Sequence, residues 1–356
     1  MYEARDRDTP TVAQGQLDLE SWMNDVRQRV DTILRGFFEQ KQEESAALSP
    51  RAIDLVTEVR DLTMRGGKRL RPIVTAVAYR AASGDPDPSP TLQVGASLEL
   101  LQSYLLIHDD WMDEDDERRG GPAVHFAFAK KHGNAHLGAS LGVLAGDLAS
   151  TFSWELFLKS TLPKGRRDEA LALFVDIQKE VFAGQQLDLM ADQDVERMHR
   201  LKTGSYTTRG PAELGGLIAD APRSKMESLR SWAVPVGVAF QLRDDLLSTF
   251  GTAQETGKPG DDLRHGKHNA VVAAFHKLSP SMPDRAALAR VWGHPDASDA
   301  DVEEATRALD GAKARVEERL ICLADEARSA LAASPFDDEG KQMLANVTRL
   351  LTERGS

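Results

Sequence analysis

The sequence has a single cysteine, Cys322, and only 6% aromatic residues. One thiol cannot form an intrachain disulfide, and such a chain is typical of a reducing cytoplasm. No stretch approaches the ~18 consecutive apolar residues that a membrane-spanning helix needs. The first residues also lack the apolar segment of a secretion signal. We therefore expect a cytoplasmic protein without a membrane span.

Positive charge is also in short supply, because Lys+Arg 44 against Asp+Glu 56 gives a net charge of −12. No basic stripe is interleaved with aromatic residues, so nucleic acid is not an expected partner. The nine histidines are scattered, without the spacing to Cys or Glu that a zinc site needs. The basic residues gather instead in short Gly- and Pro-rich segments, which suits a small anionic ligand.

Alternating strand patterns of useful length are missing, whereas apolar residues recur at helical spacing. An example is the series Leu19, Trp22, Met23, Val26, Val30, Ile33 and Phe37. We predict an all-α protein whose residues 17–356 form one large helical domain, preceded by a disordered tail at residues 1–16. The Pro-rich residues 83–90 are predicted to be a loop.

An acidic run follows the apolar segment 98–107. Asp109 and Asp113 are four residues apart, so on a helix they face the same side, one turn apart. Like charges at this spacing destabilise a helix unless a cation neutralises them. Magnesium prefers such oxygen ligands and completes its shell with water and phosphate. Arg118 and Arg119 follow just before a Gly-Gly-Pro turn, where their guanidinium groups can bind a diphosphate.

Acidic helix ends are usually solvated, but a second element of this kind favours a site. Asp244 and Asp245 end another apolar helical segment, and two facing acidic helices could hold metal from both sides. Lys202, Lys258 and Lys267 lie in Gly- or Pro-rich segments and are candidate phosphate ligands. Upstream, Gly66 and Gly67 allow close backbone approach to an anion. They precede Lys68 and Arg71, which share a helix face.

Together these segments resemble the trans-isoprenyl diphosphate synthase (polyprenyl synthetase) family. The matching motifs occur in the family's order across roughly residues 60–270. They are the Gly-Gly-Lys-Arg-Leu-Arg-Pro segment 66–72, Asp-Asp-x-x-Asp at 109–113 with Arg-Arg-Gly, Gly146-Asp147, residues 184–188, Lys202-Thr203, Gln-x-x-Asp-Asp at 241–245 and the loop 256–267.

The resemblance implies a helical bundle of the isoprenoid synthase type around a central active-site cavity. It also implies a homodimer and chain elongation, in which isopentenyl diphosphate condenses with dimethylallyl, geranyl or farnesyl diphosphate. Three magnesium ions are implied per site, held by Asp109, Asp113 and Asp244. Catalysis would add Lys202, Thr203 and Gln241. The implied substrate-binding residues are Arg118, Lys258 and Lys267 for the allylic diphosphate, with Asp245 orienting this set, and Lys68, Arg71, Gln102 and Arg119 for isopentenyl diphosphate.

Product length depends in this family on a large side chain five positions before the first aspartate, which is Tyr104 here. With no insertion in the motif, the resemblance favours a C20 geranylgeranyl product, with C15 farnesyl as the alternative. On a straight helix, however, Leu105 lies about 40° from Asp109 and Tyr104 about 140°. Leu101 and Leu105 are therefore further candidates for lining the tail pocket.

Two departures leave alternatives open. Ser248 stands where the second motif usually has a third aspartate, and type I terpene cyclases use a serine there. Thr252 stands where the cyclase motif needs its glutamate, and a cyclase has no use for a second diphosphate site. A non-catalytic subunit is disfavoured because both motifs keep two aspartates. Trp111, inside the first motif, has no predicted role.

Overall fold

The computed structural model describes residues 19–252 and 260–353. Within these ranges the chain is almost wholly helical, which confirms the all-α prediction. Residues 1–16, predicted to be a tail, lie outside the described residues, as does Lys258. None of the described helices combines the length and the apolar character that a membrane crossing requires.

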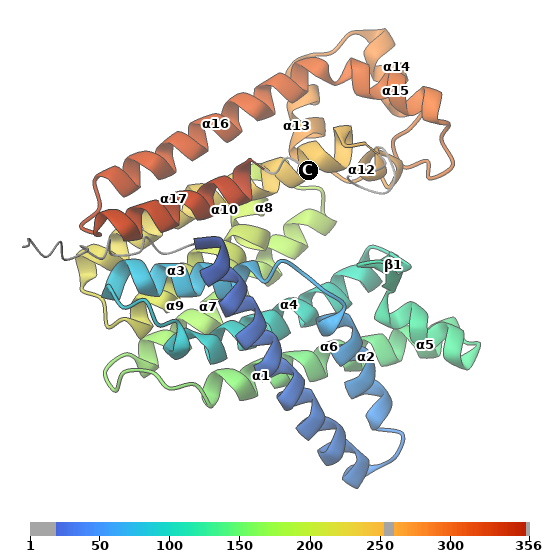
Figure 1. The fold of residues 1–356 in the computed structure, drawn as a ribbon. Helices are drawn as coiled ribbons and strands as arrows, with labels where there is room; N and C mark the ends of the chain where they lie inside the picture. The colour runs from blue at the N-terminus through green and yellow to red at the C-terminus, as the bar shows by residue number, and fades with distance from the viewer. Residues whose placement is uncertain (1–18, 253–259, 354–356) are drawn as a thin grey trace, which may run out of the picture.

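The first half of the chain builds one side of the bundle (Figure 1). Its helices and its one small hairpin are α1 (Leu19–Leu48), α2 (Ile53–Met64), α3 (Leu70–Ser83), the short 3₁₀ helix η1 (Ser89–Thr91), α4 (Leu92–Met112), β1 (Glu117–Arg118), β2 (Gly121–Pro122), α5 (Val124–His132) and α6 (Ala135–Leu158). The predicted loop at 83–90 thus lies between α3 and α4. Its first residue ends α3, and its last two residues begin η1.

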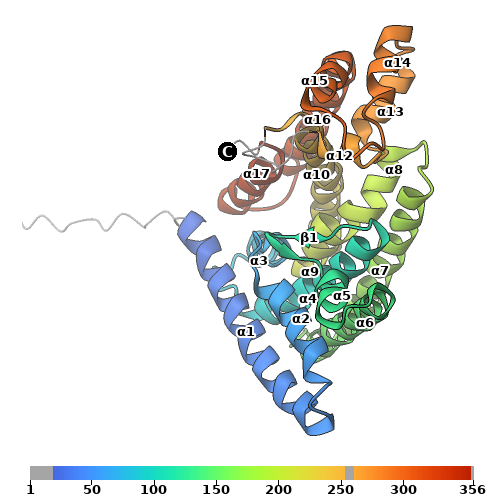
Figure 2. The same ribbon diagram turned by 90° about the vertical axis from the view of Figure 1, so that its right-hand side faces the viewer.

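The second half packs over α3 and continues into an outer extension. It consists of α7 (Arg167–Leu189), α8 (Val195–His199), the π-helix η2 (Arg200–Arg209), α9 (Gly210–Ile218), α10 (Arg223–Phe250), α12 (Asp261–Arg264), α13 (Ala270–Lys277), α14 (Met282–Ala289), α15 (Asp299–Ala308), α16 (Asp310–Ala332) and α17 (Asp338–Thr352). Figure 2 shows α12–α15 together at one end, from which α16 returns along α10 to α17.

Helix α4 lies inside the bundle, packed against α1, α3 and α6. Its first ten residues, 92–101, are buried except for Gln93; most of them are apolar, and the buried Glu99 accepts a hydrogen bond from Arg69 Nη1 at 2.9 Å. Gly95 lets α3 approach closely, since a Cβ at this position would lie 3.0 Å from Pro72. The helix is therefore held firmly along its length, and it projects its acidic C-terminal turn from the core.

Candidate active site

A polar cavity of about 510 Å³ opens where α3, α4, η2 and α10 converge. It gathers residues from all of the matching motifs except Gly146-Asp147. The predicted residues that line it are Lys68, Arg71, Gln102, Asp109, Asp113, Arg118, Arg119, Lys202, Thr203, Gln241, Asp244, Asp245 and Lys267. Ser248, the serine in the place of a third aspartate, lines it too.

The first acidic motif occupies the C-terminal end of α4. Asp109 and Asp113 both face the cavity, as their spacing predicts. Asp110, between them, is fully buried and accepts a hydrogen bond from Arg118 Nε at 2.6 Å. Burial raises the pKa of Asp110 to about 6, against the opposing charge of Arg118. Asp110 thus anchors the β1–β2 hairpin to α4, and Arg118 reaches the cavity with its guanidinium already paired.

Two lysines from distant segments bind the cavity aspartates. Lys202 Nζ lies 3.1 Å from Asp109 Oδ1 and 2.5 Å from Asp188 Oδ2. Burial alone would lower the pKa of Lys202, but Asp109 and Asp188 outweigh it and raise the pKa. Lys267 Nζ lies 3.0 Å from Asp113 Oδ2, and its pKa is raised in the same way. Both ammonium groups are therefore charged and aimed at the acidic motif.

The second acidic motif ends α10 on the opposite wall. Asp244 and Asp245 both line the cavity, but Asp245 is only 4% exposed and is enclosed by polar partners. Gln241 Nε2 donates to Asp245 Oδ1 at 3.0 Å, and the backbone N–H of Ala270 donates to Oδ2 at 2.8 Å. Thr203 in turn donates to Gln241 Oε1 at 2.8 Å. Asp245, Gln241 and Thr203 thus form one chain of hydrogen bonds behind Asp244.

A basic wall faces the cavity from the α3 side. Arg71 donates to Thr207 Oγ1 at 2.9 Å, and its Cζ lies 4.1 Å from the centre of the Tyr206 ring. Arg119 donates to the carbonyl oxygen of Gly66 at 2.8 Å. Gly66 and Gly67 have φ angles of 108° and 129°, a region that glycine adopts readily. The glycine pair therefore shapes the loop that carries Lys68 and receives Arg119.

A small apolar side cavity of about 90 Å³ continues from the polar one between α4 and α7. Tyr104, Leu105 and Phe182 line it together with Asp109 and Lys202, which belong to both cavities. The Tyr104 ring meets the Phe182 ring edge to face, with centroids 6.2 Å apart. Leu101, by contrast, is fully buried in the core and does not line this cavity. Tyr104 reaches the cavity although a straight helix would turn it well away from Asp109.

Helix η2 brings Lys202 and Thr203 to the cavity and is wound as a π-helix, a form often found at functional sites. It is held between α7 and α10 by two glycines. A Cβ at Gly184 would lie 2.2 Å from the backbone nitrogen of Lys202, and one at Gly237 would lie 2.7 Å from Gly204 Cα. No other residue type fits at either place without a shift of the backbone.

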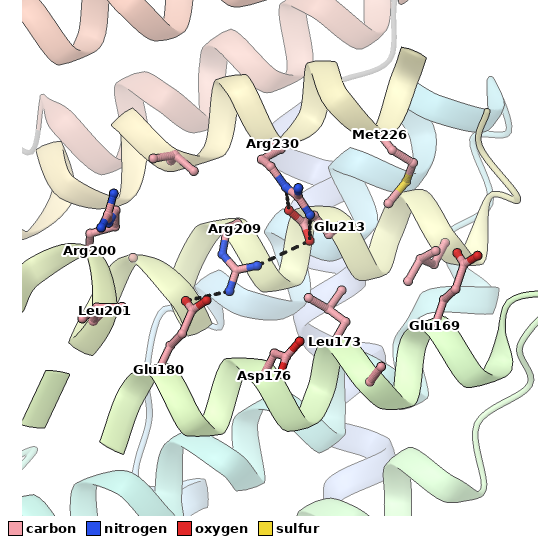
Figure 3. Close-up of a pocket in the computed structure, with 14 residues that line it drawn as sticks. Glu169, Leu173, Asp176, Glu180, Arg200, Leu201, Arg209, Glu213, Met226 and Arg230 are labelled. Atoms are coloured by element: carbon pink, nitrogen blue, oxygen red, sulfur yellow. Dashed lines mark hydrogen bonds and ion pairs between the residues drawn. The ribbon is translucent and has the colours of Figure 1, made fainter. Parts of the chain in front are cut away.

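A larger groove, of about 670 Å³, lies between α7 and α10 on the other side of η2. Figure 3 shows that alternating charges cross it. Arg209 Nη2 lies 2.8 Å from Glu180, and Glu213 pairs with both Arg209 and Arg230, at 3.5 Å and 2.5 Å. None of the predicted site residues lines this groove. The ion pairs connect α7, η2, α9 and α10 behind the active-site cavity.

Two residues with a part in the site were not predicted to have one. Asp188 belongs to a matching segment, but its pairing with Lys202 needs the fold to be seen. His199 carries no motif signal beyond lying three residues before Lys202, and it is buried against Asp245. Trp111 is 42% exposed on the surface, and nothing in the structure explains its place in the motif.

Comparisons with known proteins agree with this geometry. The family model "Polyprenyl synthetase" matches residues 54–309. A short chain isoprenyl diphosphate synthase of Methanocaldococcus jannaschii is 32% identical over 256 residues, which cover 70% of this chain and 74% of that protein. A farnesyl diphosphate synthase of Geobacillus stearothermophilus is also 32% identical, over 71% of this chain and 83% of that protein.

Among solved structures, a geranylgeranyl pyrophosphate synthase of Corynebacterium glutamicum, complexed with isoprenyl diphosphate and magnesium, superposes with a TM-score of 0.86. It is 32% identical to this chain, and the match covers 95% of this chain and all of that one. The sequence resemblance is thereby confirmed, and the chain belongs to the polyprenyl synthetase family.

Proposed function

We propose that the protein is a chain-elongating prenyltransferase, which condenses isopentenyl diphosphate with an allylic diphosphate to a linear all-trans product. The observation that carries this proposal is one cavity with an acidic half and a basic half. Asp109, Asp113 and Asp244 face it from two helices, and Lys68, Arg71 and Arg119 face it from the α3 side. Two diphosphates can therefore bind side by side, each by its own set of residues.

The acidic half fits magnesium. Within the ranges 19–252 and 260–353, no three Asp, Glu, His or Cys side chains are close enough together to hold a metal by themselves. This suits an ion that takes few protein ligands and fills its shell with water and substrate phosphate. We assign Asp109, Asp113 and Asp244 as the ligands of three ions. When bound, magnesium neutralises the negative charge of the allylic diphosphate as it departs.

The protein's own groups then position and stabilise the reacting parts. Lys202 and Lys267, both charged and close to the aspartates, add hydrogen bonds that strengthen as charge builds on the leaving diphosphate. Thr203 and Gln241 offer neutral oxygens toward an allylic cation without attacking it. Lys68, Arg71, Arg119 and Gln102 hold isopentenyl diphosphate. The departing diphosphate removes the final proton, and Asp245 orients Gln241.

We propose a C20 product, with C15 as the alternative. The side cavity supports a length limit, because it shares Asp109 and Lys202 with the polar cavity and is also lined by the Tyr104 and Phe182 rings, which meet edge to face. Its apolar lining gains about 0.8 kcal/mol for each CH₂ group of the growing tail that it buries. The named relatives include both farnesyl and geranylgeranyl synthases, so the product of this chain has to be measured.

The decisive experiment incubates the protein with isopentenyl diphosphate, magnesium and each of the three allylic primers, and identifies the products by mass. A linear C20 diphosphate is the expected result. A cyclic hydrocarbon from the allylic substrate alone would contradict elongation and favour a type I terpene cyclase. No turnover of any primer would favour a non-catalytic subunit.

We further propose a cytoplasmic homodimer that needs neither nucleic acid nor a membrane.

A further inference from the structure

His199 joins the second acidic motif from a helix that carries no aspartate motif of its own. It is the last residue of α8 and directly precedes η2. Its side chain is only 3% exposed, and its Nε2 lies 3.2 Å from Asp245 Oδ2. A histidine on an apolar helix face is usually a packing residue, but this one is aimed at a buried carboxylate. Neither the sequence motifs nor the family comparison gives it a role.

Asp245 depends on such a partner. Its carboxylate is 4% exposed, and a buried carboxylate is costly unless donors surround it. Ala270 and Gln241 supply one hydrogen bond each, and His199 adds a third polar contact, with its Nε2 3.2 Å from Oδ2. Because Oδ2 accepts the Ala270 N–H and also contacts His199 Nε2, these two contacts fix the plane of the carboxylate. Asp245 Oδ1 then has one orientation in which to receive Gln241.

The chain of contacts continues into the cavity. Gln241 Nε2 donates to Asp245, which leaves its Oε1 to accept the hydroxyl of Thr203. An amide turned the other way would place two donors against Thr203 and an oxygen against the carboxylate. The Asp245 carboxylate therefore selects the amide orientation of Gln241. It also holds the last turns of α10, from which the adjacent Asp244 faces the cavity.

We propose that His199 is a positioning residue for the diphosphate site, acting through Asp245 on Gln241, Thr203 and Asp244. This inference rests on the proposed function, because it assumes that the cavity binds a diphosphate together with magnesium. The imidazole borders the cavity but is only 3% exposed and is directed at Asp245, so we infer that it does not itself touch the reacting atoms. It aligns the groups that do, in the way that outer partners orient metal ligands in other sites.

The test compares His199→Leu, which removes the donor at similar volume, with His199→Gln, whose amide can donate to Asp245. Loss of an outer partner typically lowers metal affinity or activity about 10–100-fold. We expect H199L to lower kcat by about that factor and to need more magnesium for half-maximal rate. The KM for isopentenyl diphosphate should stay within about twofold of the parent value, since the basic wall is untouched. H199Q should recover most of kcat.

A second readout is independent of turnover. Magnesium plus inorganic pyrophosphate should raise the thermal midpoint of the parent and of H199Q clearly more than that of H199L. His294→Leu, at an exposed loop histidine, is the matched control and should behave as the parent in both assays. If H199L does not fold, His199→Met offers a more adaptable side chain that also lacks the donor.

A purely structural role predicts a different pattern: a lower midpoint without ligand, but unchanged kcat and unchanged stabilisation by pyrophosphate in the folded fraction. That pattern, or an H199Q variant no better than H199L, would overturn the inference. The proposed function fails by a separate result, namely a parent protein that transfers no prenyl group. In that case the thermal-midpoint comparison with pyrophosphate still tests the role of His199, because it does not depend on turnover.

Discussion

At the scale of single residues, the aspartates of the two acidic motifs differ in burial and in role. Asp109, Asp113 and Asp244 face the cavity, while Asp110 and Asp245 are buried and organise the hairpin and α10. We expect Asp109→Ala and Asp244→Ala each to lower kcat by at least 10²–10³-fold, the loss typical of one electrostatic stabiliser. Steady-state kinetics at saturating magnesium measures this. Near-parental turnover of D244A would show that the second motif holds no metal.

Ser248 gives the matching conservative test. Its hydroxyl donates to the backbone carbonyl oxygen of Asp244 at 3.0 Å, within its own helix. Replacing it with Asp restores the usual third aspartate of the family motif at a position that already lines the cavity. We expect Ser248→Asp to retain activity, and it serves as the acidic-motif control for D244A.

The basic wall should be specific for one of the two substrates. We expect Lys68→Ala or Arg71→Ala to raise KM for isopentenyl diphosphate at least tenfold, because a charged hydrogen bond contributes about 1.5–3 kcal/mol. KM for the allylic diphosphate should change little. Titrating each substrate with the other saturating separates the two constants. An equal rise in both would reject the assignment of two separate anion sites.

Tyr104 is the residue that limits chain length in the proposal. Tyr104→Ala removes a ring that lines the side cavity and meets Phe182, so we expect longer products with the first condensation largely intact. Mass analysis of the products measures the shift. Leu101→Ala is the comparison, because Leu101 is buried in the core and should affect stability without lengthening the product. Unchanged products from Y104A would leave Leu105 as the next candidate.

At the scale of elements, the position of η2 depends on contacts at both of its faces. One face bears Lys202 and Thr203, and the other meets the ion pairs of the groove in Figure 3. Glu213 is 3% exposed and pairs with Arg209 and Arg230. Arg209→Met removes the partner of Glu180 and one of the two partners of Glu213. Breaking a buried pair by removing one partner costs about 3–5 kcal/mol.

Arg230 still pairs with Glu213 in this variant. We therefore expect R209M to lower the free energy of unfolding by less than a fully broken buried pair would, about 1–3 kcal/mol. Urea unfolding measures it. Arg223→Met, which breaks a fully exposed pair with Glu227, is the control and should be near neutral. If R209M is as stable as the parent, the ion pairs across the groove do not hold η2 in place.

The helices could be predicted from the sequence better than the tertiary contacts between them. Helices and the acidic turns follow from apolar spacing and local charge, and the motifs contain most of the polar residues that line the cavity. Lys202 and Asp109 lie 93 positions apart, however, so no local pattern can indicate that they pair. The π-helical winding of η2 and the burial of Asp110 and His199 arise from tertiary packing against α7, α10 and the hairpin. A projection of one helix also cannot place Tyr104 at the side cavity, because the wall of that cavity includes Phe182 of α7.

At the scale of the whole molecule, α6 and α7 each carry a regular row of exposed apolar side chains. Leu137, Leu144 and Leu158 on α6, and Val175, Phe182 and Leu189 on α7, are 40% to 55% exposed. Their separations are multiples of seven, so each row follows one side of its helix. Exposed apolar patches of this extent mark interaction surfaces. They support the proposed homodimer, which would bury the same face of both copies.

We expect the parent protein to elute at twice the monomer mass in size-exclusion chromatography with light scattering. Leu144→Glu, in the middle of the α6 row, should shift the population toward monomer, since it places a charge in an apolar contact. Ile321→Glu changes an equally exposed side chain on α16 and serves as the control. A parent that is monomeric at micromolar concentration would contradict the dimer.

The contact of Gly184 with the backbone of Lys202 has a genetic consequence. Every amino acid other than glycine brings a Cβ atom, and here that atom would lie 2.2 Å from the Lys202 nitrogen. Every missense mutation of codon 184 therefore pushes η2 away from α7, whatever the chemistry of the new side chain. Position 184 takes no part in binding or proton transfer, yet heritable variation should be as restricted there as at Lys202.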